Sequence, residues 1–139
     1  ALKYAGGPWK HKFASEGNEH VKKMCKQLHS GPAACKHIYP DVREAYGNRK
    51  HVDLYVSGFP CQPFSAIGQG HGSKDPRNAS EAVLDYITDF KPKVVVLENA
   101  KGFAERRTPT FVEVLKKLQQ ASYKATWNAM RRDDPGVPA

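Results

Sequence analysis

The sequence predicts an α/β fold with a mostly parallel sheet. Short apolar runs alternate with helix-length amphipathic segments along the 139 residues, which is the pattern of βαβ units. Two of these runs lead into residues that can carry chemistry: residues 53–57 precede Gly-Phe-Pro-Cys, and residues 93–97 precede Glu98-Asn99. Strands that pair in parallel present their carboxyl ends at one edge, so a thiol and a carboxyl group are expected near each other.

The first part of the chain predicts two weak strands and one helix. A strand over residues 12–15 runs into Glu16, and apolar residues spaced i, i+3, i+4 and i+7 predict a helix over residues 18–28. A Gly-Pro break follows, and then a short strand over residues 37–39 that ends near Asp41.

The rest of the chain predicts strands over residues 53–57, 93–97 and 123–128 and amphipathic helices over 80–90 and 110–121. Ser80 is a plausible N-cap of the first of these helices. The run 93–97 is continuous in Val and Leu, which is typical of a central parallel strand buried on both faces. Residues 67–77 hold three glycines and a proline and predict a mobile loop.

Composition favours a nucleic-acid partner and an intracellular location. Lys plus Arg number 22 against 14 Asp plus Glu, a net charge of +8 that suits a polyanion, although a basic protein without such a partner would have the same balance. No apolar stretch is long enough to span a bilayer and no signal peptide is visible. Three cysteines without a Cys-x-x-Cys pair indicate a reducing compartment, which would be the nucleus in a eukaryote and otherwise the cytoplasm or nucleoid.

Cys61 and Glu98 are the main candidates for catalysis. Cys61 lies between two prolines directly after a strand, where a thiolate nucleophile is favoured over a buried structural thiol. Cys25 and Cys35 are interpreted as such structural thiols. Glu98 ends an apolar strand and could donate a proton, but by itself it could equally be a surface glutamate.

Glu16 and Asp41 are candidates for binding a nucleotide. Each closes a short predicted strand, where an acid in a nucleotide-binding α/β sheet bonds a ribose hydroxyl; each could instead cap a helix. Cys25, His29, Cys35 and His37 are metal-ligand types, but their spacing does not fit the usual zinc pairs, so no metal site is expected.

The segments GFPCQPFSAIG and VVVLENAKGF together resemble the motifs of the DNA (cytosine-5)-methyltransferases. The resemblance extends over nearly the whole chain and implies a Rossmann-like sheet of the kind that binds S-adenosylmethionine. The family's Phe-x-Gly-x-Gly loop, its Gln-x-Arg-x-Arg motif and its target-recognition region do not occur within residues 1–139. We therefore expect the chain to be the central part of the catalytic domain.

The resemblance also implies a role for each matching residue. Cys61 would attack C6 of a cytosine flipped out of the duplex. Glu98 would hydrogen-bond and protonate N3, and Asn99 would help to position the site. S-adenosylmethionine would be held by residues that match the family's cofactor segments, namely Glu16, Asp41, Val42 and Pro60. The remaining matches would close on DNA as part of a lid; they are Gln62, Ser65 and Arg77.

The resemblance leaves two alternatives open. The RNA-methylating branch of the family has similar motifs, although Gly58-Phe59 before Pro60 is more similar to the DNA enzymes. The chain could also be a nucleic-acid-binding remnant that keeps the charge and the fold without turnover. A redox or cysteine-hydrolase role ranks lowest, because no resolving cysteine or histidine partner can be assigned.

Overall fold

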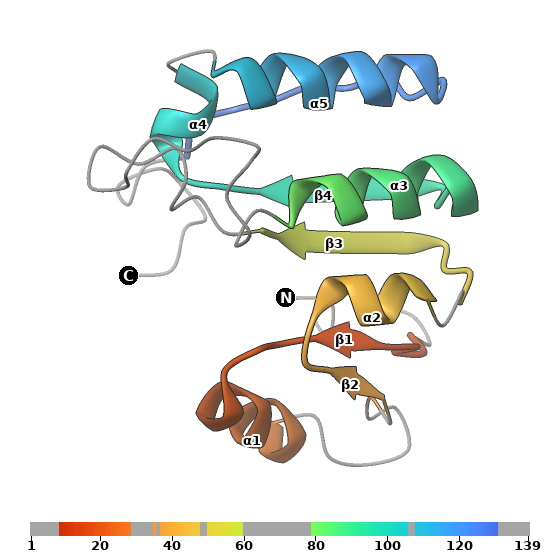
Figure 1. Cartoon of the computed structure of the whole chain (residues 1–139), viewed down its shortest axis with the longest axis vertical. Helices are drawn as coiled ribbons and strands as arrows, with labels where there is room; N and C mark the ends of the chain where they lie inside the picture. The colour runs from red at the N-terminus through yellow and green to blue at the C-terminus, as the bar shows by residue number, and fades with distance from the viewer. Residues whose placement is uncertain are drawn as a thin grey trace. The chain divides into compact units, whose positions relative to one another are not determined.

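The computed structural model describes residues 9–28, 35, 37–47, 50–59, 79–105 and 108–130. The chain divides into two units, Ala1–Val52 and Asp53–Ala139, which are considered separately. Each unit contains two parallel strands joined through a helix (Figure 1). The prediction of an α/β fold with parallel strands is therefore confirmed for the described residues.

The first unit contains the strands β1 (Ala14–Ser15) and β2 (Ile38–Tyr39) and the helices α1 (Glu19–Leu28) and α2 (Val42–Gly47). Ala14 is in register with Ile38, and Ser15 with Tyr39. The pairing continues one residue further, because the Glu16 amide donates to the Tyr39 carbonyl at 2.9 Å. Both strands are shorter than predicted, and α2 was not predicted.

Helix α1 begins one residue after the start that the apolar spacing predicted, with Asn18 as its cap. The Asn18 Oδ1 atom accepts hydrogen bonds from the amides of His20 and Val21, at 2.9 and 3.2 Å. Its predicted apolar stripe is not buried, because Val21 is 38% exposed and Met24 is 56% exposed.

The second unit is built on the strands β3 (Leu54–Gly58) and β4 (Val94–Glu98). Helix α3 (Ser80–Phe90) connects them, and α4 (Lys101–Glu105) and α5 (Pro109–Gln120) follow β4 (Figure 1). Helix α3 packs against α5. The fully buried side chains of this unit include Val83, Tyr86 and Ile87, all on α3, so this helix supplies much of the core.

Both strands of this pair end one residue later than predicted, at Gly58 and at Glu98. Their register runs from Leu54 opposite Val94 to Gly58 opposite Glu98. Glu98 is thus the last paired residue of β4, whereas the sequence predicted that it would follow the strand.

The prediction that β4 is buried on both faces is wrong for the described structure. Side chains alternate along a strand, and partners in a parallel register point to the same face. On one face Val56, Val94 and Val96 are 56%, 54% and 48% exposed. On the other face Tyr55 is buried, and its ring stacks on Tyr86 of α3 at 4.6 Å between centroids.

Two further predictions differ from the structure, and a third is not tested by it. Ala79 occupies the N-cap position of α3 and no side chain caps that helix, so Ser80 is its buried first residue. Helix α4 was not predicted, because its five residues are too few to show a period. The predicted loop 67–77 lies outside the described residues.

Of the helices in the described ranges, none combines the length and apolarity needed to cross a membrane.

The predicted strand over residues 123–128 is also wrong, because the described part of this segment pairs with no strand. Helix α5 ends instead in a Schellman motif: the Ser122 amide donates to the Gln119 carbonyl and the Tyr123 amide to the Leu118 carbonyl. The Tyr123 hydroxyl donates to the Pro92 carbonyl, so the ring is held by the turn before β4. Tyr123 and Trp127 in this segment make side-chain contacts, and the backbone here is not part of a sheet.

Replacing Ser122 with glycine should stabilise the second unit. Ser122 has φ of 69°, a left-handed conformation that glycine adopts without a Cβ clash. We expect Ser122→Gly to raise the free energy of unfolding by about 0.5–1 kcal/mol, measured by urea denaturation. The control Lys116→Gly, in the exposed helix interior, should lower it by about 1 kcal/mol. A Ser122→Gly variant no more stable than wild type would contradict this account of the helix end.

Tyr86 should make the second unit sensitive to alkali. Burial, with a smaller contribution from the neighbouring Tyr55, raises the pKa of Tyr86 from 10.0 to about 12. Between pH 10 and 12 the unfolded chain loses this proton while the folded chain retains it, so stability should fall as pH rises through that window. Tyr86→Phe should flatten this fall in denaturation curves recorded from about pH 9 to pH 12. An unchanged alkaline fall in the variant would assign the sensitivity to other groups.

Candidate active site

The candidate active site of the second unit lies at the carboxyl ends of β3 and β4. Gly58 and Glu98 face each other in register as the last residues of the two strands. Phe59 and Asn99 follow them directly, and Cys61 comes two residues after Phe59. The pairing therefore brings a carboxyl group and the approach to the predicted nucleophile to one sheet edge, as the sequence predicted.

Asn99 ties the two strand ends together after the ladder stops. Its Nδ2 atom donates a hydrogen bond to the Phe59 carbonyl at 3.1 Å, across 40 residues of sequence. Its Oδ1 atom accepts from the Ala100 amide at 2.9 Å, which fixes the orientation of the side-chain amide. Asn99 thus acts as one further rung, built from a side chain, between the ends of β3 and β4.

Phe59 anchors the segment that leads toward Cys61. It is only 6% exposed, and its ring meets Phe103 of α4 edge-to-face at 5.5 Å between centroids. The contact continues from Phe103 to Phe111 at 5.7 Å and from Phe111 to Trp127 at 5.8 Å. A buried ring and a hydrogen-bonded carbonyl on the same residue leave its backbone little freedom.

The surroundings of Glu98 differ from those predicted. The sequence suggested an apolar setting at the end of a buried strand, whereas Glu98 is exposed. No hydrogen bond or ion pair joins its carboxyl group to another described residue. Its Oε2 atom instead lies close over the backbone of Gly58, 3.0 Å from the point where a Cβ atom would stand. The carboxyl group therefore rests against the end of β3, and neither of its oxygens is bonded to a described residue.

Several predicted site residues lie outside the described residues, and the structure gives no geometry for them. They are Pro60, Cys61, Gln62, Ser65 and Arg77. Of the predicted catalytic residues, the structure therefore brings together Glu98 and Asn99. Both lie next to Phe59, which is two positions before Cys61 in the sequence.

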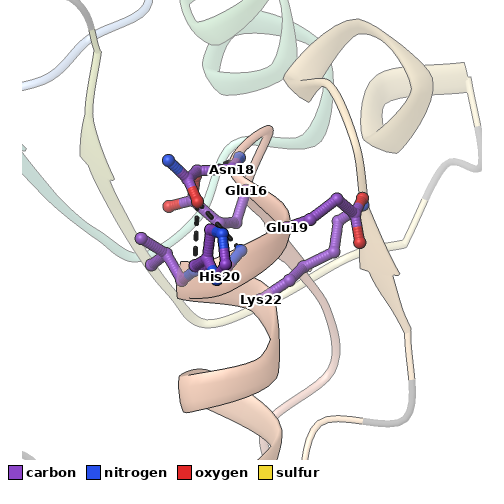
Figure 2. Close-up of polar contacts among 6 residues, drawn as sticks. Glu16, Asn18, Glu19, His20 and Lys22 are labelled. Atoms are coloured by element: carbon purple, nitrogen blue, oxygen red, sulfur yellow. Dashed lines mark hydrogen bonds and ion pairs between the residues drawn. The ribbon is translucent and has the colours of Figure 1, made fainter.

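Glu16 lies at the carboxyl end of β1 in the first unit, beside the start of α1 (Figure 2). Its Oε1 atom accepts a hydrogen bond from the Asn18 amide at 2.7 Å, which orients the carboxylate at the positive end of the helix. The described residues offer no partner to its second oxygen. Asn18, rather than Glu16, is the residue that caps α1.

Asp41 lies at the matching end of β2 and is the N-cap of α2, which was one of its two interpretations. Its Oδ1 atom accepts from the Arg43 amide at 2.8 Å and lies 3.3 Å from Arg43 Nε. Val42 is the half-buried first residue of that helix. Gly17 keeps the two strand ends close, because a Cβ atom there would lie 3.3 Å from the Pro40 carbonyl oxygen. Glu16 and Asp41 therefore share one edge of the β1–β2 pair.

The interpretation of Cys25 and Cys35 as buried structural thiols needs correction, because both are only half-buried. The Cys35 thiol donates to the His37 carbonyl at 3.1 Å, a local contact next to β2. Among the described side chains no group of three or more is arranged to hold a metal ion.

Comparison with known proteins decides the family. The family profile of the C-5 cytosine-specific DNA methylases matches residues 1–139. The chain belongs to this family. Its relatives include the Type II methyltransferase M.NlaX of Neisseria lactamica, 31% identical over 129 residues, which covers 91% of this chain and 40% of the relative. M.PspPI of Psychrobacter sp. is 36% identical over 112 residues, which covers 77% of this chain and 27% of the relative.

The resemblance inferred from the two motifs is thereby confirmed. A third relative, the Type II methyltransferase M.AplI of Arthrospira platensis, is 27% identical over 88 residues, 63% of this chain and 26% of the relative. The chain spans between 21% and 40% of the length of eight curated relatives that it matches. Membership of the methylase family follows from the match.

Three contributors to the site were not predicted from the methylase motifs. Phe59 and Phe103 form the aromatic anchor, and the bond from Asn99 to the Phe59 carbonyl closes the strand ends. The sequence carried only a weak signal for them, since both phenylalanines lie within or beside the two motifs that hold the polar residues.

Asn99 should contribute to the stability of the methylase site through its bond to Phe59. Asn99→Asp keeps the Oδ1 acceptor for Ala100 and removes the Nδ2 donor, leaving the part-buried Phe59 carbonyl without a partner. We expect this variant to lower the free energy of unfolding by about 1–2 kcal/mol in urea denaturation. Asn99→Ala should cost at least as much. A stable Asn99→Asp variant would show that the bond contributes little to holding the strand ends.

Proposed function

We propose that this chain carries the catalytic part of an enzyme that transfers a methyl group from S-adenosylmethionine to C5 of cytosine in DNA. The observation that carries the proposal is the closed end of the β3–β4 pair. There the bond from Asn99 to Phe59 holds a carboxyl group and the segment leading to Cys61 at one edge. The family match and the net charge of +8 support DNA as the substrate.

In the proposed reaction Cys61 acts as the nucleophile and Glu98 as the acid. The Cys61 thiolate adds to C6 of a flipped-out cytosine while the Glu98 carboxyl group donates its proton to N3, so the negative charge is not left on the ring. Bound S-adenosylmethionine supplies the methyl group as an electrophile to C5. Loss of the C5 proton to a base, departure of the Cys61 sulfur from C6 as a thiolate and return of the N3 proton to the Glu98 carboxylate restore the aromatic ring and the starting state of the enzyme.

The first unit offers groups suited to the nucleoside part of the methyl donor, within a fold that we propose to be Rossmann-like. Glu16 and Asp41 end adjacent parallel strands, where α/β sheets bind nucleotides. Each carboxylate has one oxygen held by a backbone amide, which leaves the other to accept a hydrogen bond from a ribose hydroxyl. We propose that Val42 and Pro60 also contact the donor, and that Gln62, Ser65 and Arg77 contact DNA.

The covalent step can be trapped with DNA that contains 5-fluorocytosine, because fluorine at C5 prevents the final elimination. With S-adenosylmethionine and the full-length protein that carries this sequence, we expect an adduct that survives denaturing electrophoresis. Cys61→Ser should abolish the adduct, whereas Cys25→Ser, which changes a half-buried thiol of α1, should retain it. Glu98→Gln should slow its formation by about 10²-fold or more.

The same assay separates the alternatives. RNA containing 5-fluorocytidine should compete poorly; an adduct formed only with RNA would transfer the proposal to the RNA-methylating branch. Retention of DNA without any adduct from the full-length protein would favour a nucleic-acid-binding remnant and would contradict the enzyme proposal.

A further inference from the structure

Gly58 stands at the one position of β3 that faces the candidate acid. It is in register with Glu98, and partners in a parallel pair project to the same face of the sheet. A Cβ atom on Gly58 would lie 3.0 Å from Glu98 Oε2 and 4.0 Å from Glu98 Cβ. The carboxyl group of Glu98 therefore occupies the place that a side chain at position 58 would need.

The backbone of Gly58 does not itself require glycine. Gly58 is a regular strand residue whose conformation is open to L-amino acids, since its φ lies outside the left-handed region. The requirement is spatial and concerns one group, the Glu98 carboxyl. By contrast, a Cβ atom on Gly47 at the end of α2 would meet nothing within 4 Å.

We infer that Gly58 is a positioning residue for Glu98: the absence of a side chain at position 58 provides the space in which the carboxyl group rests at the carboxyl end of β3. The inference rests on the role of Glu98 in the proposed function. Glu98 is exposed and no described residue gives it a hydrogen bond, so the shape of the surface beneath it is what limits its rotamers.

Substitution at position 58 should separate stability from catalysis. The atom that would be displaced is the far end of a flexible, exposed side chain, so Glu98 can swing away at little cost to folding. Alanine or valine also suits a strand better than glycine does. General acid catalysis, however, requires hydrogen-bond reach to the substrate atom, and misplacement by about 1 Å can cost about 10²-fold in rate.

A graded series tests the inference in the full-length enzyme. We expect Gly58→Ala to lower kcat by about 10-fold and Gly58→Val by about 10²-fold, with KM for DNA and the melting temperature little changed. The matched control Gly47→Ala should leave kcat unchanged. Wild-type kcat in Gly58→Val would overturn the inference.

A double-mutant cycle with Glu98→Gln identifies the group through which Gly58 acts. If Gly58 positions the acid, Gly58→Val should cost less than about 3-fold once Glu98 is replaced by glutamine, because there is no acid left to misplace. An undiminished loss in that background would overturn the inference and assign the effect to the Cys61 segment. Full activity of Glu98→Gln alone would instead contradict the proposed role of Glu98.

A measurement of side-chain position in the full-length protein keeps the inference testable whatever the activity. In wild type, nuclear Overhauser contacts are expected between the Gly58 α-protons and the Glu98 side chain, because the two lie within van der Waals contact. The branched side chain introduced by Gly58→Val should displace the Glu98 carboxyl group and shift the γ-proton signals of Glu98. Absence of the contacts in wild type would overturn the inference directly.

Discussion

The parallel pairing of β3 with β4 is the constraint on which the second unit depends. Its register matches five residues on each strand and ends at Gly58 and Glu98. A shift by one residue would move Glu98 to the other face of the sheet and take Asn99 out of line with Phe59. The burial of Tyr55 against Tyr86 opposes such a shift, since it would turn this ring away from α3. Packing on the helix-covered face thus fixes the register, and with it the positions of Glu98 and Asn99 at the strand ends.

Beyond the last backbone hydrogen bond between β3 and β4, side-chain contacts hold the two strand ends together. Asn99 bonds to the Phe59 carbonyl, and the Phe59 ring packs on Phe103, so polar and apolar contacts fix the same residue from two directions. Helix α4 is short, yet its place soon after Asn99 brings Phe103 to this ring. The point at which the chain leaves β3 is therefore fixed at Phe59.

The sequence predicted the elements that follow from residue periodicity and chain order. It did not predict the features that tertiary contacts determine. Helices α1, α3 and α5 have strong apolar periods, and β3 and β4 are short apolar runs. The parallel pairing of the two strands follows from the helix between them. The segment 123–128 was wrongly predicted as a strand, because the sequence of a segment does not reveal whether a partner strand exists. The exposure of Val56, Val94 and Val96 could not be predicted either. A valine-rich strand suggests that other elements cover it, but its sequence does not show whether they do. At the site, the motifs identified Glu98 and Asn99, whereas the support from Phe103 and the space left by Gly58 appear only once the strands are in register.

The carboxylates at the strand ends differ in how they are held, and the difference matches the roles proposed for them. Glu16 and Asp41 each commit one oxygen to a backbone amide at a helix start, which suits groups that only accept hydrogen bonds from a ligand hydroxyl. Glu98 commits neither oxygen to a described residue and lies over a glycine. A group that must release and regain a proton in each cycle benefits from this, because an amide bonded to its oxygen would have to be broken or compensated at every turnover. Contact with Gly58 can orient the carboxyl group without a hydrogen bond to either of its oxygens. The shape of the surface thus does at Glu98 what backbone amides do at Glu16 and Asp41.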